Sequence, residues 1–182
     1  MINPYAVGKL CYLRVPEEFD ENSNWHQWFS DPTVTKYLPR RYWPNTKTDL
    51  RRFIRKLVGE KSLLVLLVCS LDSDIPIGVV SLDEINLVHR YAGFSMVFPP
   101  IVNGEPRISF EASTLILDIA FYRLNLLNVK TFTVSSNAAS INMQKLLGFK
   151  DVGTFSNIFN IGGEQHNETC MQLNVSDWRN RA

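Results

Sequence analysis

Hydrophobic positions along the chain follow two periods, and together they predict a protein that mixes strands with helices. Short apolar or alternating runs bounded by Gly, Pro or polar residues are typical of strands. An uninterrupted apolar run lies between Ser62 and Ser70, as is typical of a central strand covered on both faces. The predicted strands are Lys9–Val15, Ser62–Ser70, Ile75–Leu82, Arg90–Phe98, Val129–Val134, Val152–Ile161 and Gln165–Val175.

Four other segments repeat apolar residues at helical spacing. They are Phe19–Phe29, Thr46–Glu60, Ile108–Leu127 and the segment from Asn137 to Leu147. The second is the clearest amphipathic helix, and Thr46 with Asp49 makes a start that is similar to a capping box. Its other face carries the cations Lys47, Arg51, Arg52, Arg55 and Lys56. A solvated face is the favoured interpretation, and a docking surface for an anionic acceptor is the alternative.

Length and composition predict one domain, residues 1–182, because 45% of the 182 residues are hydrophobic and no linker or repeat interrupts them. The net charge is only +1, so the chain as a whole is not an obvious binder of polyanions such as nucleic acids. Cys11, Cys69 and Cys170 have neither disulfide-framework nor metal-ligand spacing. The first residues do not resemble a signal peptide, and the longest apolar run is shorter than the roughly 20 residues that cross a bilayer. We therefore expect a cytoplasmic protein with no metal and no membrane contact.

The stretch from Asn128 to Phe149 gives the clearest local order. A β-branched and aromatic run, Val129–Val134, is followed by two serines and then by Asn137, whose side chain suits a helix N-cap. Gly148 ends the helix that follows, as a C-cap. The order is strand, polar turn, capped helix and then Gly-Phe.

This order resembles the second half of the GNAT acetyltransferase fold, whose pattern reads roughly N-x-x-[AS]-I-x-L-Y-E-K-L-G-F. The matching residues are Asn137, Ser140, Ile141, Leu147, Gly148 and Phe149. The segments GKLCYLRV and WFSDPTVTKYL, within residues 8–38, resemble the ribosomal-protein-acetylating subfamily. The resemblance covers nearly the whole chain and implies an α/β (α+β) GNAT acyltransferase fold. Its twisted, mixed, mostly antiparallel sheet should have six to seven strands flanked by about four helices.

The resemblance implies an acetyl-CoA-dependent N-acetyltransferase. The acceptor would be a primary amine of a small molecule, such as an amino sugar or a nucleotide-linked amine, or of a protein. In this family the fourth and fifth strands separate and the pantetheine arm lies between them. Carried over to this chain, the cofactor contacts are Met96, Val97 and Phe98 on one side and Asn137 and Ser140 on the other.

The pyrophosphate of the cofactor normally lies on a loop of the form [QR]-x-x-G-x-[GA], where glycine N–H groups and a helix N-terminus point at the anion. That motif is absent from PIVNGEPRIS, which begins at residue 100. The resemblance implies that Asn103, Gly104, Arg107 and Ile108 take its place, with the cation of Arg107 supplying charge.

The family's general acid, a tyrosine, is replaced by Gln144, whose amide can hydrogen-bond a sulfur but cannot give up a proton. Asp83, Glu84 and His89 lie between the third and fourth predicted strands. Of these, Glu84 and His89 are the predicted alternatives for the base that deprotonates the amine.

The predicted acceptor-binding residues are Trp28, Tyr37 and Tyr42, although packing alone would also explain each of them. Two other functions stay open at this point. The degenerate loop and Gln144 are compatible with a non-catalytic GNAT-fold protein that binds an acyl-CoA or a partner. The basic helix face is compatible with an acetyltransferase acting on nucleic acid, which we favour least. We expect a monomer or a homodimer.

Overall fold

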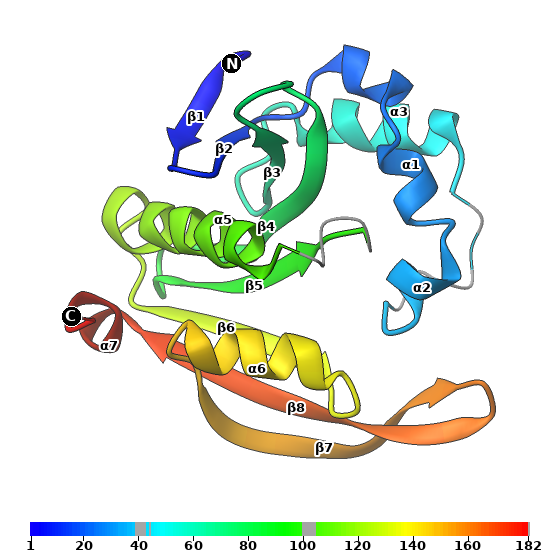
Figure 1. Ribbon diagram of the computed structural model, residues 1–182. Helices are drawn as coiled ribbons and strands as arrows, with labels where there is room; N and C mark the ends of the chain where they lie inside the picture. The colour runs from blue at the N-terminus through cyan, green and yellow to red at the C-terminus, as the bar shows by residue number, and fades with distance from the viewer. Residues whose placement is uncertain (39–42, 44, 100–104, 182) are drawn as a thin grey trace.

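The computed structural model describes residues 1–38, 43, 45–99 and 105–181. Eight strands form one mixed sheet in the order β1-β2-β3-β4-β5-β6-β8-β7, in which β5 and β6 are parallel and the other neighbours antiparallel (Figure 1). The strands are β1 (Pro4–Val7), β2 (Cys11–Arg14), β3 (Leu64–Ser70), β4 (Pro76–Asn86), β5 (Tyr91–Val97), β6 (Asn128–Val134), β7 (Lys150–Ile161) and β8 (Glu164–Asn174). The predicted mixed, mostly antiparallel sheet is confirmed, with one strand more.

The helical elements of the described residues are η1 (Glu18–Asn22), α1 (Trp25–Trp28), α2 (Pro32–Thr35), α3 (Lys47–Leu57), α5 (Pro106–Asp118), the π-helical η3 (Ile119–Arg123), α6 (Ala138–Leu146) and α7 (Val175–Arg179). The single helix predicted over Phe19–Phe29 is wrong, because Ser23 adopts an extended conformation between η1 and α1. Within the described part of the chain, no helix combines the length and the apolar composition needed to cross a membrane.

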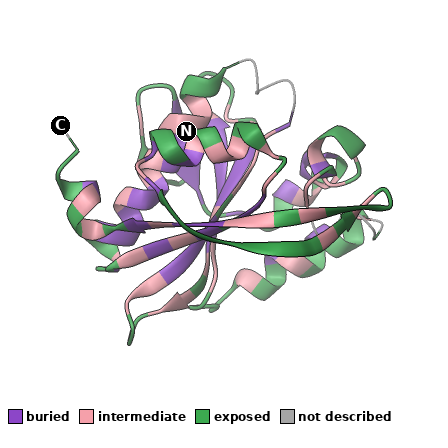
Figure 2. Cartoon of the chain, turned by 90° about the horizontal axis from the view of Figure 1, so that it is seen from below, coloured by how far each residue is buried: buried purple, intermediate pink, exposed green. Residues whose placement is uncertain are grey.

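Helices cover both faces of the central strands. Leu66 of β3 belongs to a core cluster that also contains Ile116 of α5, whereas its neighbour Leu67 packs in a second cluster with Ile54 of α3. This arrangement is what the uninterrupted apolar run predicts, because successive residues of a strand point to opposite faces. Figure 2 shows burial concentrated in the middle of the sheet, while most of β7 is exposed.

A buried ion pair fixes η1 against the sheet. Arg14 of β2 donates two hydrogen bonds of 2.7 Å to the carboxylate of Asp20, and both side chains are almost fully buried. The same carboxylate accepts the backbone N–H of Glu17 at 2.8 Å. Removing one partner of such a pair would leave an uncompensated buried charge, which is strongly destabilising. The ion pair therefore fixes the position of η1, through which the chain passes from β2 to α1 and α2.

A second charge joins α5 to the β1–β2 turn. The Glu111 carboxylate accepts the backbone N–H groups of Lys9, Leu10 and Cys11 at 2.8, 2.7 and 3.0 Å. It packs so close to Gly8 that a Cβ there would lie 2.4 Å from Oε2. Burial alone would raise the pKa of Glu111, but the three N–H donors outweigh it and hold that pKa below its usual value.

Glu111→Gln tests this connection. Because the folded-state pKa of Glu111 is lowered, its stabilisation is complete above the usual pKa of 4.5 and is lost as the pH falls through the folded value. We expect Glu111→Gln to lower the unfolding free energy at pH 7 by about 1–3 kcal/mol, and by less in acid. The measurement is urea unfolding across a pH series. The control is Glu164→Gln, because the Glu164 side chain is 84% exposed. Parallel losses for both variants at every pH would contradict the assignment.

Candidate active site

The sheet opens between β5 and β6. These strands pair at only three positions, Tyr91 with Asn128, Ala92 with Val129 and Gly93 with Lys130. Beyond that point β5 stays beside β4, and β6 stays beside β8, so the two strands separate (Figure 1). Among the described residues, the backbone of β5 after Gly93 therefore has no strand partner on the β6 side. This is the separation that the resemblance to the GNAT family predicts.

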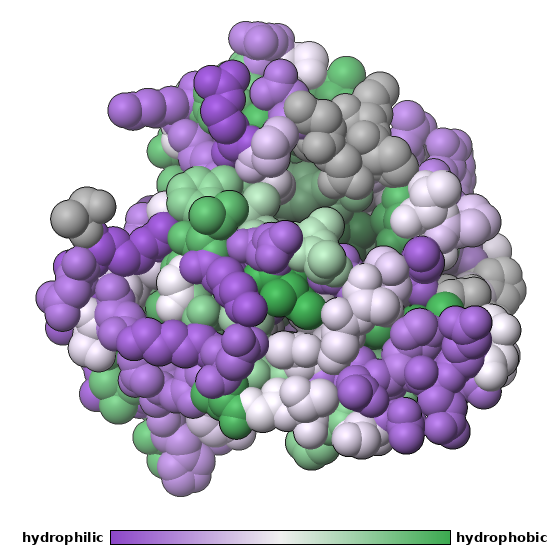
Figure 3. Space-filling model, turned by 60° about the horizontal axis from the view of Figure 1, so that its bottom comes forward, coloured by the Kyte–Doolittle hydropathy of each residue, from purple (hydrophilic) through white to green (hydrophobic). Residues whose placement is uncertain are grey.

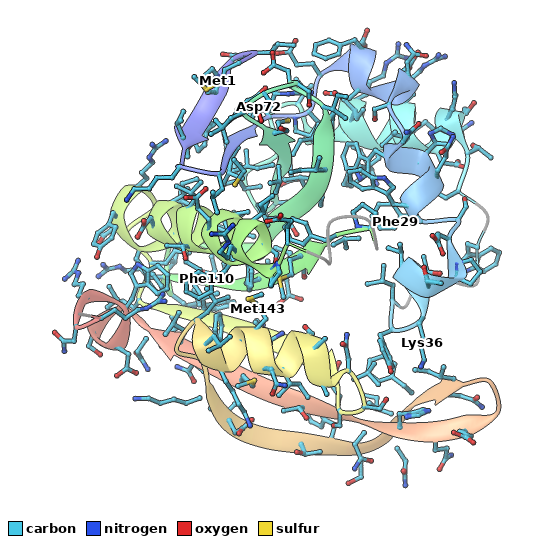
Figure 4. The ribbon with its side chains drawn as sticks, in the orientation of Figure 1. Met1, Phe29, Lys36, Asp72, Phe110 and Met143 are labelled. Carbon is cyan, nitrogen blue, oxygen red and sulfur yellow. The ribbon has the colours of Figure 1, made fainter. Side chains whose placement is uncertain are left out.

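Each strand is bound to a different helix, which accounts for the separation. Met96 of β5 accepts a hydrogen bond of 3.5 Å from the hydroxyl of Ser113 on α5. Phe94, the first residue after the last paired position, stacks on Phe149 with ring centroids 6.0 Å apart. The partly buried side chains of Phe110 on α5 and Met143 on α6 lie in the space between the two helices (Figure 4).

Gln144 binds β6 to α6. Its buried side chain accepts the hydroxyl of Thr131 at 2.8 Å and donates to the hydroxyls of Thr133 at 2.8 Å and Ser140 at 3.1 Å. Both N–H donors of the amide are thus used, and only the carbonyl oxygen has a free lone pair. Donating to a departing sulfur would require one of these bonds to break.

The polar turn after β6 has the predicted form. Asn137 is the N-cap of α6, and its side-chain oxygen accepts the backbone N–H of Ser140 at 3.2 Å. The side-chain nitrogen of Asn137 makes no hydrogen bond to another described residue. Two serines separate Asn137 from the end of β6, so Asn137 lies at the β6 side of the opening. Its contact with the cofactor stays a prediction.

Two consecutive carboxylates lie beside the opening, on the sheet face opposite α5 and α6. Asp83 of β4 pairs with Gly93, and a bulge follows because the next pair joins Asn86 to Tyr91. Glu84 sits in this bulge with a φ of 48°, a left-handed conformation that is uncommon outside glycine. A regular strand would send these two side chains to opposite faces, and the bulge brings both to one side.

Glu84 is committed to an ion pair. Its carboxylate lies 2.7 Å from the ammonium of Lys130 on β6, and that ammonium also lies over the rings of Tyr91 and Phe132, at 5.0 and 5.4 Å. We call the surface formed by Asp83, Glu84, Ser95, Lys130 and Phe132 the carboxylate face.

The carboxyl of Asp83 is half-buried, and burial raises its pKa. The hydroxyl of Ser95, which donates to it at 3.2 Å, opposes this shift. The charge of Glu84 raises the pKa further, and that of Lys130 lowers it. The sequence pattern did not single out Asp83, because the register that places it opposite Gly93 appears only in the structure.

His89 lies elsewhere. It is exposed in the turn that joins β4 to β5, where its backbone N–H donates to the Asn86 side chain at 2.7 Å. This turn precedes the paired segment of β5, whereas the opening follows that segment. The structure therefore brings Glu84 to the opening and leaves His89 at the other end of the strand.

A cavity of about 640 Å³ lies between the end of α2 and the β7–β8 hairpin. The described residues that line it are Lys36, Tyr37, Leu38, Val134 and the segment 158–163. The hydroxyl of Tyr37 donates to the backbone oxygen of Ser136 at 3.3 Å, which joins α2 to the turn after β6. Lys36 projects from α2 toward the hairpin (Figure 4). On the face of the molecule that Figure 3 shows, apolar side chains are exposed near the middle and polar side chains surround them.

The remaining predicted site residues are distributed as follows. Trp28 is buried in the second core cluster, with Trp25 and Leu50. Met96, Phe98 and Ile108 pack against the main core, whereas Val97 is half-buried at the end of β5. Tyr42, Asn103 and Gly104 lie outside the described residues.

The cations of the two predicted anion-binding sites differ in how closely they are paired with carboxylates. The Arg107 side chain, at the start of α5, is 78% exposed and lies 3.9 Å from Glu105. On α3, by contrast, Arg51 pairs with Glu21, and Arg55 pairs with Glu18 at 3.1 Å. These ion pairs favour the interpretation of the α3 surface as a solvated face. Among the described residues, no group of three or more His, Cys, Asp or Glu side chains is arranged to hold a metal ion.

Comparisons with known proteins agree with this geometry. The spermidine N(1)-acetyltransferase of Escherichia coli (strain K12) is 28% identical over 162 residues, covering 87% of this chain and 78% of the relative. The spermidine N(1)-acetyltransferase of Vibrio cholerae serotype O1 is 32% identical over 109 residues, covering 58% of this chain and 61% of the relative. These names support the family but not the ribosomal-protein-acetylating subfamily specifically.

Solved structures share the fold. Spermidine N-acetyltransferase from Vibrio cholerae, in complex with CoA and spermine, superposes with a TM-score of 0.86 and 22% identity, covering 95% of this chain and all of the other. A GNAT-family acetyltransferase from Bacillus anthracis has a TM-score of 0.80 and 21% identity, covering 94% of this chain and 98% of the other. The family model described as acetyltransferase (GNAT) domain matches residues 11–150. The chain therefore belongs to the GNAT acetyltransferase family, and it is an acyltransferase that uses acetyl-CoA to acetylate an amine.

Proposed function

We propose that the chain acetylates a primary amine of an aliphatic polyamine. Such an acceptor carries ammonium groups separated by methylene segments, so it needs acidic groups near an apolar wall. The observation that carries the proposal is the pair of adjacent carboxylates, Asp83 and Glu84, on one face beside the opening. The names of the two spermidine N(1)-acetyltransferases support the same class of acceptor.

The charges of the carboxylate face favour a cation. Glu168 of β8 pairs directly with Val134, so by strand alternation its side chain lies on the same side of the sheet as Lys130. The carboxylate face thus carries two carboxylates and one ammonium, and the Lys130 ammonium is paired with Glu84. Glu168 adds a third carboxylate further along the same side of the sheet. A surface with an excess of negative charge attracts ammonium groups and raises their local concentration.

The cavity suits methylene groups better than a sugar. Its described lining is apolar at Leu38, Val134, Ile158, Phe159 and Ile161. The polar side chains of the lining are Lys36, Tyr37 and Asn160. Any hydroxyl of a polyhydroxylated amino sugar that faced the apolar side chains would lack a hydrogen-bond partner, which is costly. Val134 lies four residues beyond Lys130 on β6, about 13 Å at the usual rise of a strand. A linear amine can span that length between the cavity and the carboxylate face.

The residues of this chain fit acetyl-CoA at the opening. Unpaired backbone groups at Met96, Val97 and Phe98 and the side-chain amide of Asn137 would hold the pantetheine, and exposed Arg107 would meet a phosphate. The bound cofactor supplies an activated acetyl group as a thioester. The chain contributes position, donors toward the carbonyl oxygen, and a carboxylate that takes the proton of the amine. Glu84 and His89 stay predictions for that last role, and the former lies at the opening.

The first prediction concerns the acceptor. With acetyl-CoA, the wild-type protein should release CoA with spermidine faster than with glucosamine, because the latter lacks a second ammonium for the carboxylate face. The measurement is a thiol-release assay at equal amine concentrations, with the product identified by mass spectrometry. Turnover of glucosamine but not of spermidine would contradict the proposed acceptor and leave the family assignment intact.

A second prediction concerns Arg107. Arg107→Ala should weaken binding of CoA by about 1–3 kcal/mol while leaving pantetheine binding unchanged, because only CoA carries phosphates. Titration calorimetry with both ligands gives the comparison. Lys9→Ala, on the β1–β2 turn, provides a matched loss of one positive charge. Equal weakening of both ligands by Arg107→Ala would remove the phosphate role.

A third prediction concerns Gln144, which the hydrogen bonds favour as a structural residue. Gln144→Leu should cost about 1–3 kcal/mol of unfolding free energy, because it leaves two buried threonine hydroxyls without this partner. In a protein with Thr131→Val and Thr133→Val, the same change should cost less. The turnover number, corrected for the folded fraction, should stay within about threefold. A loss of about 100-fold in a fully folded variant would assign Gln144 a catalytic contact instead.

A further inference from the structure

We propose that Asp83, and not Glu84 or His89, is the carboxylate that accepts the proton of the attacking amine. This inference deepens the proposed function and rests on it, because it requires that an amine is acetylated at the opening between β5 and β6.

Asp83 lies at the last paired position before the strands separate. It is opposite Gly93, which in turn pairs with Lys130, the final residue of β6 that is bonded to β5. Its carboxylate occupies the space that a side chain at position 93 would fill, since a Cβ there would lie 1.9 Å from Oδ1. The absence of a side chain at Gly93 is therefore what lets the carboxylate reach over β5 toward the opening.

Few protein groups hold this carboxylate. Its one hydrogen bond among the described residues is the 3.2 Å contact from the Ser95 hydroxyl, which is longer than the usual O–H···O distance. Most of its acceptor capacity is free for a ligand or a water molecule. The side chain of Ser95, two residues beyond Gly93 on β5, is exposed, so the carboxylate has an accessible side.

The neighbouring carboxylate is engaged in a different way. Glu84 and Lys130 form an ion pair at 2.7 Å, and the Lys130 ammonium is held over two aromatic rings. The Glu84 carboxylate is therefore committed to Lys130, whereas most of the acceptor capacity of the Asp83 carboxylate is free. The titratable groups that face Asp83 are Glu84 from its own strand, Tyr91 from β5 and Lys130 from β6.

Burial also favours Asp83 as a base. It raises the pKa of Asp83, the Ser95 hydrogen bond opposes that shift, and the charge of Glu84 adds to it. A carboxylate with a raised pKa binds a proton more strongly, which brings it closer to the basicity that proton abstraction requires.

The proton balance of the reaction is complete with one carboxylate. An ammonium acceptor gives one proton to Asp83 and becomes a neutral amine. The nitrogen lone pair then forms a bond to the thioester carbonyl carbon as the bond from that carbon to sulfur breaks. The second amine proton goes to the departing thiolate, through solvent, and the products are an acetamide and CoA. Asp83 finally releases its proton to water.

The test compares three isosteric variants by steady-state kinetics with spermidine across a pH series. Asp83→Asn should lower kcat/KM for spermidine by about 100-fold or more at pH 7, because the proton acceptor is lost. Its deficit should shrink as the pH rises, since solvent then deprotonates the amine. The KM for acetyl-CoA should stay within about twofold, because Asp83 acts only on the acceptor. Glu84→Gln should lose much less, and Asp72→Asn, in the β3–β4 turn far from the opening (Figure 4), should behave like wild type.

Two outcomes would overturn the inference. One is an Asp83→Asn variant that keeps kcat/KM and its pH dependence, and the other is a larger loss in Glu84→Gln than in Asp83→Asn. Failure of the proposed function is distinguishable from both. A wild-type protein that acetylates another amine and not spermidine contradicts the polyamine acceptor alone, and the variants are then compared on that amine. Thermal unfolding of each variant verifies that a kinetic loss is not a loss of folded protein.

Discussion

The separation of two parallel strands after three paired residues is the constraint on which the site depends. A strand normally satisfies its backbone groups by pairing along its length. Here β5 continues to Val97 and β6 to Val134 with no bond between them, because β4 and α5 hold the one while β8 and α6 hold the other. The unpaired groups are available to a ligand that lies between the strands. Asp83 and Glu84 lie beside this opening, Met96 and Val97 belong to the separated part of β5, and Asn137 follows the separated part of β6.

Much of the fold follows from local patterns in the sequence. The apolar run before Ser70, the Thr46 capping box and the Asn137 cap each act within a few residues, and all three are found as predicted. The break at Ser23 was not predictable, because it follows from Asp20 turning back to the buried Arg14 of another element. Strand β1 was also missed, since it is short, begins at a proline and forms only by pairing with β2.

The candidate site was predictable in part, and for a similar reason. Its cofactor side follows strand ends and a helix cap, which the family pattern marks along the chain. Its acidic side depends on the register between β4 and β5, and a bulge changes that register by one residue. No periodicity in one strand tells which residue of the next lies opposite, so the contact of Asp83 with Gly93 and the pairing of Glu84 with Lys130 appear only in three dimensions.

A crystal structure of the protein with CoA and spermidine tests the central claim most directly. We expect the CoA sulfur to lie between the separated segments of β5 and β6. We also expect a spermidine nitrogen within about 3 Å of the Asp83 carboxylate, or joined to it through one water molecule. The methylene chain should then extend along β6 toward Val134. A CoA molecule bound outside this opening, or a spermidine whose nitrogens all lie away from the carboxylate face, would contradict the account.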